Sequence, residues 1–570
     1  MNAMPPPRSA PKPAPERLKL QGQKRKTLSM MHQRLMVAML AFAFGILTIG
    51  GRIGYLAVFG SGDAAQRLAS AYTPARGDIV DREGQPLART IEGWTVAVQP
   101  KKVIGNKLDL ARQLAVLMPE KDEADYYELL TSDKSFAYLQ RRAGPRLVEA
   151  VNALGEPGLQ LTREPDRLYP QTSLAAHVIG YTDVDGNGVS GAEKAFEEEL
   201  TDPNRKGEPV ALSISAPVQG ALKAELAAAM EKFSAIGAAG VIMDIHTAEI
   251  LALTSLPQLN PNIAGQGGTE ARFNRASLGV YELGSTFKPF TVAMGLESGQ
   301  IRSMGQMYPC PQKLRVGNRS IGDTHPFGRP CSVAEIMMES SNVGTAQIAL
   351  QLGAKRQEAF LKKMHFTDRL GYELPERGTP LTPREWGDTA TATVGYGHGI
   401  AVTPVHLASG YATLFNGGVY RTPTVRKVDA NNPRAKGERV FSPQVSEQMR
   451  ALLRLVVTHG TGRKADAPGY RIGGKTGTAE KIVGGRYSRQ LVVNSFAGVF
   501  PIDDPRYVIV VMLDEPKGLP ETFGFRTAGW NVAPVVSKTV SRIAPMLGVT
   551  PDPKREPDMT QVLPHIREEG

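Results

Sequence analysis

The stretch Gly284-Ser285-Thr286-Phe287-Lys288-Pro289 decides how the rest of the chain is interpreted. Proline is tolerated in the first turn of a helix, because the amides there lack helical acceptors, so the stretch predicts a helix start. Ser285 and Lys288 would then share one face of the helix. A lysine kept neutral by burial or by a nearby cation could take the proton of the serine hydroxyl, and helix-start amides favour a developing negative charge. The pair is therefore a candidate nucleophile and base.

Two further patterns accompany this pair. Taken alone, the pair reads as a serine helix cap beside an unrelated lysine, and Ser9 and Lys12 repeat its spacing. However, Ser340-Ser341-Asn342 begins 55 residues after Ser285, and Lys475-Thr476-Gly477-Thr478 begins a further 135 residues on. Three such elements in this order are the motifs of penicillin-binding proteins and serine β-lactamases. Their coincidence favours a serine acyl-transfer site.

The residue types in the second and third patterns suit acyl transfer. Ser340 could relay a proton, and Asn342 could bind an amide of the substrate. The positive charge of Lys475 would disfavour protonation of Lys288. Ser285, Lys288, Ser340, Asn342 and Lys475 are therefore the predicted catalytic residues.

The third pattern also predicts where a substrate would bind. A strand over Lys475–Thr478 would let a substrate peptide add as a neighbouring strand, and Gly477 would let its backbone approach closely. The amides of Ser285 and Thr478 would donate to the oxyanion. The hydroxyls of Thr476 and Thr478 would hold a carboxylate of the substrate.

Most of the net charge belongs to the amino-terminal segment. Residues 1–34 hold eight basic residues and one acid, which accounts for +7 of the formal charge of +11. Six prolines lie between Pro5 and Pro15, and this composition cannot bury enough apolar surface to fold alone. Residues 1–34 are therefore predicted to be a disordered tail. The nearly balanced remainder argues against nucleic-acid binding.

An apolar run follows this tail directly. Leu35–Gly51 has 17 residues without a charge, which at about 1.5 Å per residue nearly spans a bilayer core. Residues 35–59 are predicted to be a transmembrane anchor. The basic residues before it place the amino terminus in the cytoplasm and export the rest of the chain. A cleaved signal peptide fits less well, because the run is long for one and no cleavage site follows closely, and a buried core helix is the other alternative.

Beyond the anchor the sequence predicts two folded domains. The composition, 41% hydrophobic and 22% charged, is that of a globular protein. Asp78–Leu87 has the pattern of a strand, a glycine turn and a return strand, and it opens a mixed domain that we assign to residues 60–224. Nothing in this domain indicates catalysis by itself.

The second predicted domain covers residues 225–550. Ala221–Met230 is rich in strong helix formers, and Ala239–Leu253 has the pattern of two strands around a polar turn. Helical patterns dominate from Phe287 to Leu361, and two β-branched strand candidates follow at Asn494–Phe500 and Tyr507–Leu513. Strands at both ends with helices between them predict an α+β fold. Residues 551–570, which are charged and contain prolines, are predicted to be a flexible tail.

Cysteine and histidine give little indication of a metal site. Cys310 and Cys331 are the only cysteines, and an exported chain could pair them, but two separate buried thiols remain open. His177, His246 and His398 are scattered, without metal-ligand spacing, so surface or packing roles are expected. The sequence indicates neither a metal nor a cofactor.

From the anchor to about residue 550 the chain resembles class B penicillin-binding proteins. The resemblance extends beyond the three motifs to Arg76–Arg82, Arg167–Pro170, Gly191–Glu193, Gly395–Gly397 and Thr403-Pro404. It implies a noncatalytic pedestal for dimerisation or partner binding, and a transpeptidase domain whose mainly antiparallel sheet lies between helical layers. The implied substrate is the D-alanyl-D-alanine end of a peptidoglycan stem peptide, on a lipid-linked or nascent glycan. The acyl acceptor is an amine of a neighbouring stem, and β-lactams acylate the same serine as covalent inhibitors.

Within this class the chain is most similar to the division-specific FtsI type. The short basic tail, single anchor, compact pedestal and the Ile321–His325 segment favour this type. It implies septal cell-wall synthesis at the inner membrane, with an FtsW-type glycosyltransferase and other divisome proteins as partners. No glycosyltransferase domain fits upstream of the pedestal, so another protein is expected to polymerise the glycan.

Several alternatives stay open at this stage. An elongation-type transpeptidase has the same site, and so does a β-lactam-sensing receptor, although no cytoplasmic effector is evident here. A division scaffold with a vestigial site is disfavoured by the intact motifs. A β-lactamase or carboxypeptidase would use water as the acceptor, and Ser341 departs from the aspartate found at this place in β-lactamases. The sequence does not identify the acceptor amine or the oligomeric state.

Overall fold

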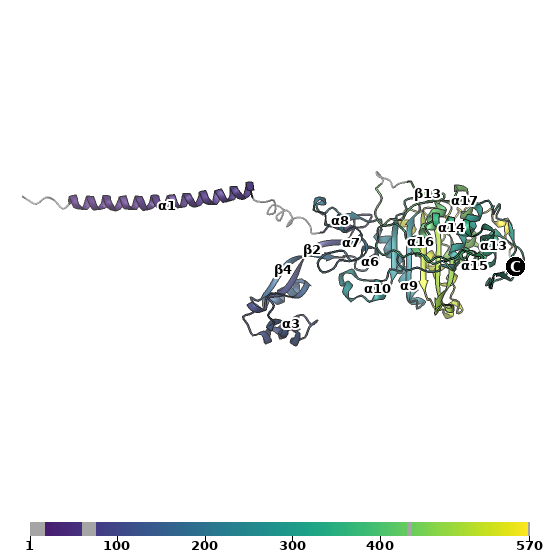
Figure 1. Cartoon of the computed structure of the whole chain (residues 1–570), viewed down its shortest axis with the longest axis horizontal. Helices are drawn as coiled ribbons and strands as arrows, with labels where there is room; N and C mark the ends of the chain where they lie inside the picture. The colour runs from purple at the N-terminus through teal and green to yellow at the C-terminus, as the bar shows by residue number, and fades with distance from the viewer. Residues whose placement is uncertain (1–16, 60–75, 430–435, 568–570) are drawn as a thin grey trace, which may run out of the picture. The chain divides into compact units, whose positions relative to one another are not determined.

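The computed structural model describes residues 17–59, 76–429 and 436–567, which fall into two units, Met1–Thr73 and Pro74–Gly570. The described part of the first unit is one helix, α1 (Arg17–Phe59), drawn in purple in Figure 1. Within α1, the 23 residues Met30–Arg52 are long and apolar enough to cross a membrane. This span is compatible with the predicted anchor.

The start of α1 corrects the prediction of a disordered tail over residues 1–34. Residues 17–34 are helical. The six prolines of residues 1–34 all lie before Arg17, and the residues after it are mostly good helix formers such as leucine, lysine and glutamine. A helix nucleated in the apolar run also extends outward at little cost. The predicted disorder of residues 1–16 falls outside the described residues.

The pedestal is built on a twisted, mostly antiparallel sheet. The predicted strand, turn and return strand are confirmed as β1 (Ile79–Val80) and β2 (Pro86–Val98). The sheet order is β3-β2-β1-β5, with β4 also paired to β2; these strands are β3 (Ala137–Ala143), β4 (Leu159–Leu168) and β5 (Val210–Ala211). Three helices enclose a small apolar core at one end: α3 (Lys107–Leu117), α4 (Glu123–Thr131) and α5 (Pro145–Ala153).

A buried ion cluster joins three separate segments of the pedestal. Glu193 is fully buried, and its carboxylate accepts from Arg76 Nε at 2.6 Å and from Arg167 Nε at 2.7 Å. Arg76 also pairs with Glu197 at 2.8 Å. Because each buried charge faces an opposite charge, the cluster fixes the chain near Arg76, the end of β4 and α7 (Gly191–Ala195) relative to one another.

The second folded region contains a five-stranded antiparallel sheet in the order β14-β15-β16-β6-β7. The predicted strand pair over residues 239–253 is confirmed as β6 (Gly237–Asp244) and β7 (Ile250–Leu256). The two later strand candidates lie in β15 (Arg486–Phe500) and β16 (Tyr507–Asp514). β14 (Gly473–Val483) pairs only with β15, so it forms one edge of the sheet.

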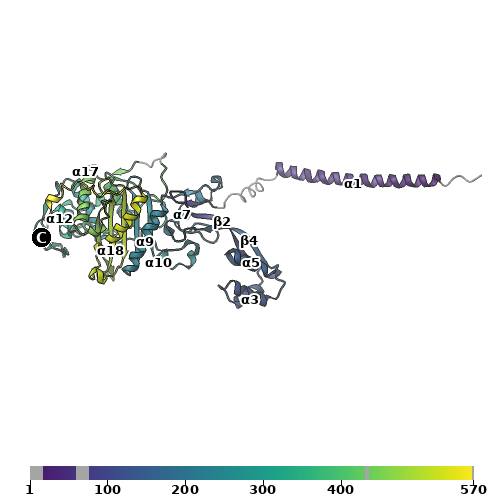
Figure 2. The same cartoon turned by 180° about the vertical axis from the view of Figure 1, so that it is seen from behind.

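Helices cover both faces of this sheet (Figures 1 and 2). On one face α9 (Ala216–Lys232) and α18 (Ala528–Met546) share a core with the strands. On the other face lies α16 (Pro404–Phe415), backed by α17 (Pro443–Thr458). The predicted sheet between helical layers is therefore confirmed. The predicted boundary at residue 225 falls inside α9, and since a continuous helix packs as one unit, a boundary before Ala216 fits the structure better.

The remaining elements connect these layers. The helices are α6 (Ala176–Ile179), α7 (Gly191–Ala195), α8 (Glu197–Thr201), α10 (Thr269–Arg272), α11 (Lys288–Glu297), α12 (Val333–Met338), α13 (Asn342–Leu352), α14 (Ala354–Lys363) and α15 (Asp388–Gly395). The short strands are β8 (Met307–Tyr308), β9 (Lys313–Val316), β10 (Arg319–Gly322), β11 (Cys331–Ser332), β12 (Val419–Tyr420) and β13 (Glu438–Arg439).

Residues 551–567 are packed against the domain, which corrects the prediction of a flexible tail. Val562 is fully buried in the main core. Arg454, whose side chain is only 3% exposed, pairs with Glu556 of this segment and with Asp466, both at 2.7 Å. A buried guanidinium requires such partners, so the charged residues of this segment serve the fold. Residues 568–570 lie outside the described part.

Deletion of residues 551–570 is expected to destabilise the protein by about 3 kcal/mol or more, because it exposes the pocket of Val562 and removes a partner of Arg454. Thermal unfolding of the full chain and the truncated chain in the same detergent measures the effect. Deletion of residues 568–570 alone is the control. Equal melting temperatures for the two deletions would contradict the packed assignment.

Candidate active site

Ser285 lies where the sequence predicts it, at the start of a helix. A 3-10 turn (Gly284–Phe287) carries the serine and continues into α11, with Pro289 in the first turn. Gly284 has a φ of +54°, and a Cβ there would meet the carbonyl oxygen of Thr478 at 2.9 Å. Only glycine therefore allows this turn to pack directly against β14.

Lys288 is completely buried one turn after Ser285. Its Nζ donates to the backbone oxygen of Ser340 and, at 3.1 Å, to Ser340 Oγ. Among the described contacts none joins Nζ to Ser285 Oγ, and catalytic hydrogen bonds often tighten only when substrate binds. Burial, reinforced by the charge of Lys475, lowers the pKa of Lys288 well below its usual value, while Asp323 acts in the opposite direction. The side chain is therefore suited to act as a neutral base.

Ser340 occupies a backbone conformation that serine seldom adopts. It sits between α12 and α13 with a φ of +63°. Non-glycine residues in this left-handed region cost free energy and persist only where the surroundings hold them. This conformation presents both the carbonyl and the hydroxyl of Ser340 to Lys288.

Lys475 is the second completely buried lysine, and it comes from β14. Its Nζ donates to Thr461 Oγ1 at 3.4 Å and to the Thr476 carbonyl at 3.3 Å. Burial lowers its pKa to about 7, against the opposing effect of Glu339. The structure thus brings Ser285, Lys288, Ser340 and Lys475 into one site from three distant segments of the chain.

Gly477 lies where β14 packs against the turn before Ser285. A Cβ at this position would meet the Leu283 carbonyl oxygen at 2.3 Å and Ser495 Oγ at 2.7 Å. The glycine is therefore required for this packing, and its predicted close approach to a substrate backbone stays a prediction.

The two threonine hydroxyls of the third motif have partners within the protein. Thr476 Oγ1 hydrogen-bonds Thr461 Oγ1 at 2.8 Å, and Thr478 Oγ1 accepts from the Ala528 amide at 3.1 Å. Their predicted contact with a substrate carboxylate, and the predicted oxyanion role of the Ser285 and Thr478 amides, stay predictions.

A cluster of aromatic and acidic side chains beside the site was missed by the sequence reasoning. Glu282 accepts from the Gly399 amide at 2.8 Å and from Tyr487 OH at 3.1 Å. The His398 ring lies 5.8 Å from that of Tyr487, and burial together with the charge of Lys288 lowers the His398 pKa to about 4. The cluster ties the segment before Ser285 to the turn after α15. Glu282, His398 and Tyr487 are far apart in the sequence and follow no motif, so the sequence does not predict the cluster.

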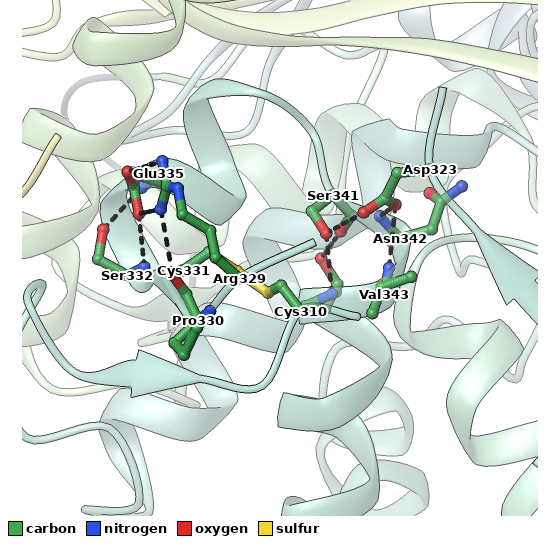
Figure 3. The surroundings of a disulfide bond; sticks show 12 residues. Cys310, Asp323, Arg329, Pro330, Cys331, Ser332, Glu335, Ser341, Asn342 and Val343 are labelled. Carbon is green, nitrogen blue, oxygen red and sulfur yellow. Dashed lines mark hydrogen bonds and ion pairs between the residues drawn. A yellow bond between two sulfur atoms is a disulfide. The ribbon is translucent and has the colours of Figure 1, made fainter. Parts of the chain in front are cut away.

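The question left open for the two cysteines is resolved, because Cys310 and Cys331 form a disulfide with a Cα–Cα distance of 5.9 Å (Figure 3). The bridge lies beside the Ser340–Asn342 motif, where Asp323 accepts from Ser341 Oγ at 2.6 Å. Sequence reasoning had singled out the segment around Asp323 without giving it this role. Among the described residues, no group of three or more His, Cys, Asp or Glu side chains is arranged to hold a metal ion.

Comparison with known proteins agrees with this geometry. Residues 238–537 match the penicillin-binding protein transpeptidase domain, and residues 71–207 match the penicillin-binding protein dimerisation domain. The chain is 37% identical over 530 residues to a probable peptidoglycan D,D-transpeptidase FtsI of Caulobacter vibrioides, covering 90% of this chain and 89% of that protein. The chain belongs to the class B penicillin-binding proteins. Its pedestal and sheet-and-helix domain correspond to the two domains of that class.

Other class B penicillin-binding proteins are similar over comparable lengths. The peptidoglycan D,D-transpeptidase FtsI of Escherichia coli K12 is 30% identical over 554 residues, covering 90% of this chain and 91% of that protein. The crystal structure of penicillin-binding protein 3 from Mycobacterium tuberculosis, complexed with ampicillin, matches with a TM-score of 0.67 at 26% identity. The match covers 85% of this chain and 98% of that one.

The pH dependence of Ser285 acylation by a β-lactam is expected to follow Lys288. The charged groups that act on Lys288 are Lys475, which lowers its pKa, and Asp323, which raises it. Only neutral Lys288 accepts a proton, so the rate rises with pH through its lowered pKa. Lys475→Gln removes a positive neighbour and raises that pKa, so the acid limb of the profile moves to higher pH.

Stopped-flow acylation rates across pH measure this shift, and Lys481→Gln is the matched control. Lys481 lies on the same strand but pairs with Asp514 at 3.0 Å, so its loss leaves the acid limb in place. An acid limb unmoved by Lys475→Gln would contradict the electrostatic coupling.

Gly477→Ala is expected to lower stability by about 1–3 kcal/mol, because the added methyl group has no space in this packing. It is also expected to slow acylation, since relief of the clash moves the turn that carries Ser285. Gly265→Ala is the control, as a Cβ there has no atom within 4 Å. Melting temperature and labelling rate give the two readouts; an unchanged labelling rate would show that the turn tolerates displacement.

Proposed function

We propose that this protein is a peptidoglycan D,D-transpeptidase that cross-links stem peptides through an acyl-enzyme on Ser285 and is inhibited by β-lactams. The observation that carries the proposal is the fully buried Lys288, held on Ser340 one turn from Ser285 and electrostatically coupled to Lys475. A lysine kept neutral in this way activates a serine hydroxyl without a metal or a cofactor. The names of the relatives, peptidoglycan D,D-transpeptidases, support the same reaction.

In the first half of the reaction Ser285 Oγ attacks the carbonyl carbon of the penultimate D-alanine while Lys288 accepts the hydroxyl proton. The tetrahedral oxyanion is stabilised by amides at the start of the turn and on β14. The carbon–nitrogen bond then breaks, and the departing D-alanine takes a proton that Lys288 delivers through Ser340. The product is an ester between the stem peptide and Ser285.

In the second half the amine of a neighbouring stem attacks this ester. The amine loses a proton to the same Lys288–Ser340 pair, a new amide bond forms, and Ser285 Oγ departs and recovers its proton. No net redox change occurs. Asn342 is assigned to binding an amide of the donor stem, and Thr476 and Thr478 to its carboxylate.

The donor peptide is assigned to the free edge of β14. This strand pairs with β15 on one side alone, so its outer backbone groups are available for an added strand. The middle of the strand lies beside the turn that carries Ser285, because Gly284 and Gly477 bring the two backbones together. An extended stem peptide along this edge would present its carbonyl to the serine.

The cellular assignment extends this proposal. α1 is assigned as a single-pass anchor in the inner membrane with a cytoplasmic amino terminus, which leaves the pedestal and the transpeptidase domain outside the cytoplasm. The likeness to FtsI proteins supports a role at the division septum. There an FtsW-type glycosyltransferase would supply the glycan strands, and other divisome proteins would contact the pedestal.

A fluorescent penicillin is expected to label the full-length protein in detergent on a single peptide that contains Ser285. Proteolysis and mass spectrometry locate the adduct, and Ser285→Ala is the control. Slow hydrolysis of the adduct distinguishes a transpeptidase from a β-lactamase. Absence of an adduct on folded protein would reject the nucleophile and favour a scaffold.

A further inference from the structure

Asp323 holds the start of α13 by three hydrogen bonds. One carboxylate oxygen accepts from Ser341 Oγ at 2.6 Å, and the other accepts from the amides of Asn342 and, at 3.1 Å, Val343 (Figure 3). The first amides of a helix have no helical acceptors, and the helix dipole favours an anion there. Asp323 is therefore a charge-assisted cap supplied from outside the helix.

This cap acts on the motif that the proposed reaction requires. Ser341 stands between Ser340 and Asn342, so fixing its hydroxyl and the next amide restricts both neighbours. Asn342 Nδ2 also donates to the Gly322 carbonyl at 3.3 Å, in the same loop as Asp323. The left-handed conformation of Ser340 has a free-energy cost, and these contacts help to offset it.

The disulfide closes the loop that carries Asp323. Cys310 and Cys331 stand at its two ends, and both are buried. Cys310 Sγ lies 3.3 Å from where a Cβ of Gly344 would be, so the bridge touches the first turn of α13. Cys331 directly precedes Ser332, the N-cap of α12. The bridge thus connects both ends of the loop to the two helices that flank Ser340.

We propose that Asp323 is a positioning residue for Ser340 and Asn342, and that the Cys310–Cys331 bridge holds the loop that carries it, so acylation of Ser285 at full rate requires the closed bridge. This inference rests on the proposed function. Closing the bridge joins the two sulfur atoms, releases two protons and passes two electrons to a disulfide oxidant, which becomes a dithiol. Activity of the site is therefore coupled to the redox state of two residues that take no part in its chemistry.

The first test replaces Asp323 by asparagine in the full-length protein. The binding constant and the acylation rate constant for a fluorescent penicillin are measured separately and normalised to titratable Ser285. The acylation rate constant is expected to fall about ten- to a hundredfold, because small misplacements of catalytic groups have effects of this size. Loss of fold alone would reduce the number of titratable sites and leave the rate constant per site unchanged.

Asp244→Asn is the matched control. Asp244 also accepts from two successive backbone amides, those of His246 at 2.8 Å and Thr247 at 3.0 Å, but it lies at the turn between β6 and β7 and contacts neither Ser340–Asn342 nor the Cys310–Cys331 loop among its described hydrogen bonds. Its rate constant per site is expected to match that of the parent. Parent-like acylation by Asp323→Asn would overturn the positioning role.

The second test examines the bridge with Cys310→Ala/Cys331→Ala, alone and combined with Asp323→Asn. The double-cysteine variant is expected to acylate several-fold more slowly. The combined variant is expected to be about as slow as Asp323→Asn, because groups that act through one element are not additive. Fully multiplicative effects, or parent-like acylation without the cysteines, would overturn the role of the bridge.

If the double-cysteine variant does not fold, the same rate constant is measured on native protein reduced with dithiothreitol, with the thiols counted by mass. Slower acylation that recovers on reoxidation supports the inference, and an unchanged rate overturns it. Failure of the parent itself to be acylated on Ser285 would overturn the proposed function. If the parent is acylated normally and Asp323→Asn is acylated equally fast, this inference would be overturned and the proposed function would stand.

Discussion

The complete burial of the Lys288 side chain is the constraint on which the rest of the site depends. An ammonium group without water is costly unless neighbours compensate it, so the protein both lowers the pKa of this lysine and surrounds it with acceptors. Those acceptors are on Ser340, whose backbone is strained to present them. Lys475, a second buried lysine, lies on β14, and its charge lowers the pKa of Lys288 further. The burial of Lys288, the strained backbone of Ser340 and the burial of Lys475 would each cost free energy alone. Together they make Lys288 a neutral base.

Rigid elements hold this arrangement. The turn that carries Ser285 is packed against β14, with no room for a side chain at Gly284 or Gly477. The Gly284 amide also donates to the Gly397 carbonyl at 3.2 Å, which ties the turn to the segment after α15. Ser340 lies between two helices, each capped by a carboxylate. Catalytic groups placed on such elements keep their geometry without help from a ligand. In the described part of the chain β14 pairs with β15 alone, so the edge of β14 beside the serine turn is open to a further strand.

Much of this architecture was predictable from the sequence, and the exceptions share a cause. Apolar runs around a polar turn predicted β6 and β7, and β-branched runs predicted strands within β15 and β16. The order of the three motifs predicted that Ser285, Lys288 and Lys475 meet in one site. Asp323, Thr461 and Glu339 were missed as contributors, since their roles arise only from long-range packing. The same holds for the segment around Val562, whose charged composition indicated exposure although Val562 is fully buried and Met559 and Ile566 pack against the core. The packing role of Gly477 was not predicted, because the sequence does not reveal which atoms lie where a side chain would be.

The sheet order has a consequence for how the polypeptide matures. β6 and β7 are made early, yet β6 gains its second neighbour only when β16 has been synthesised, after all the helices between α10 and α17. Until then one edge of β6 is an unpaired apolar strand, which invites aggregation. The segment around Val562 seals the domain later still. A nascent chain therefore keeps this edge of β6 exposed until β16 has been synthesised, and the sheet closes only in the last part of the folding sequence.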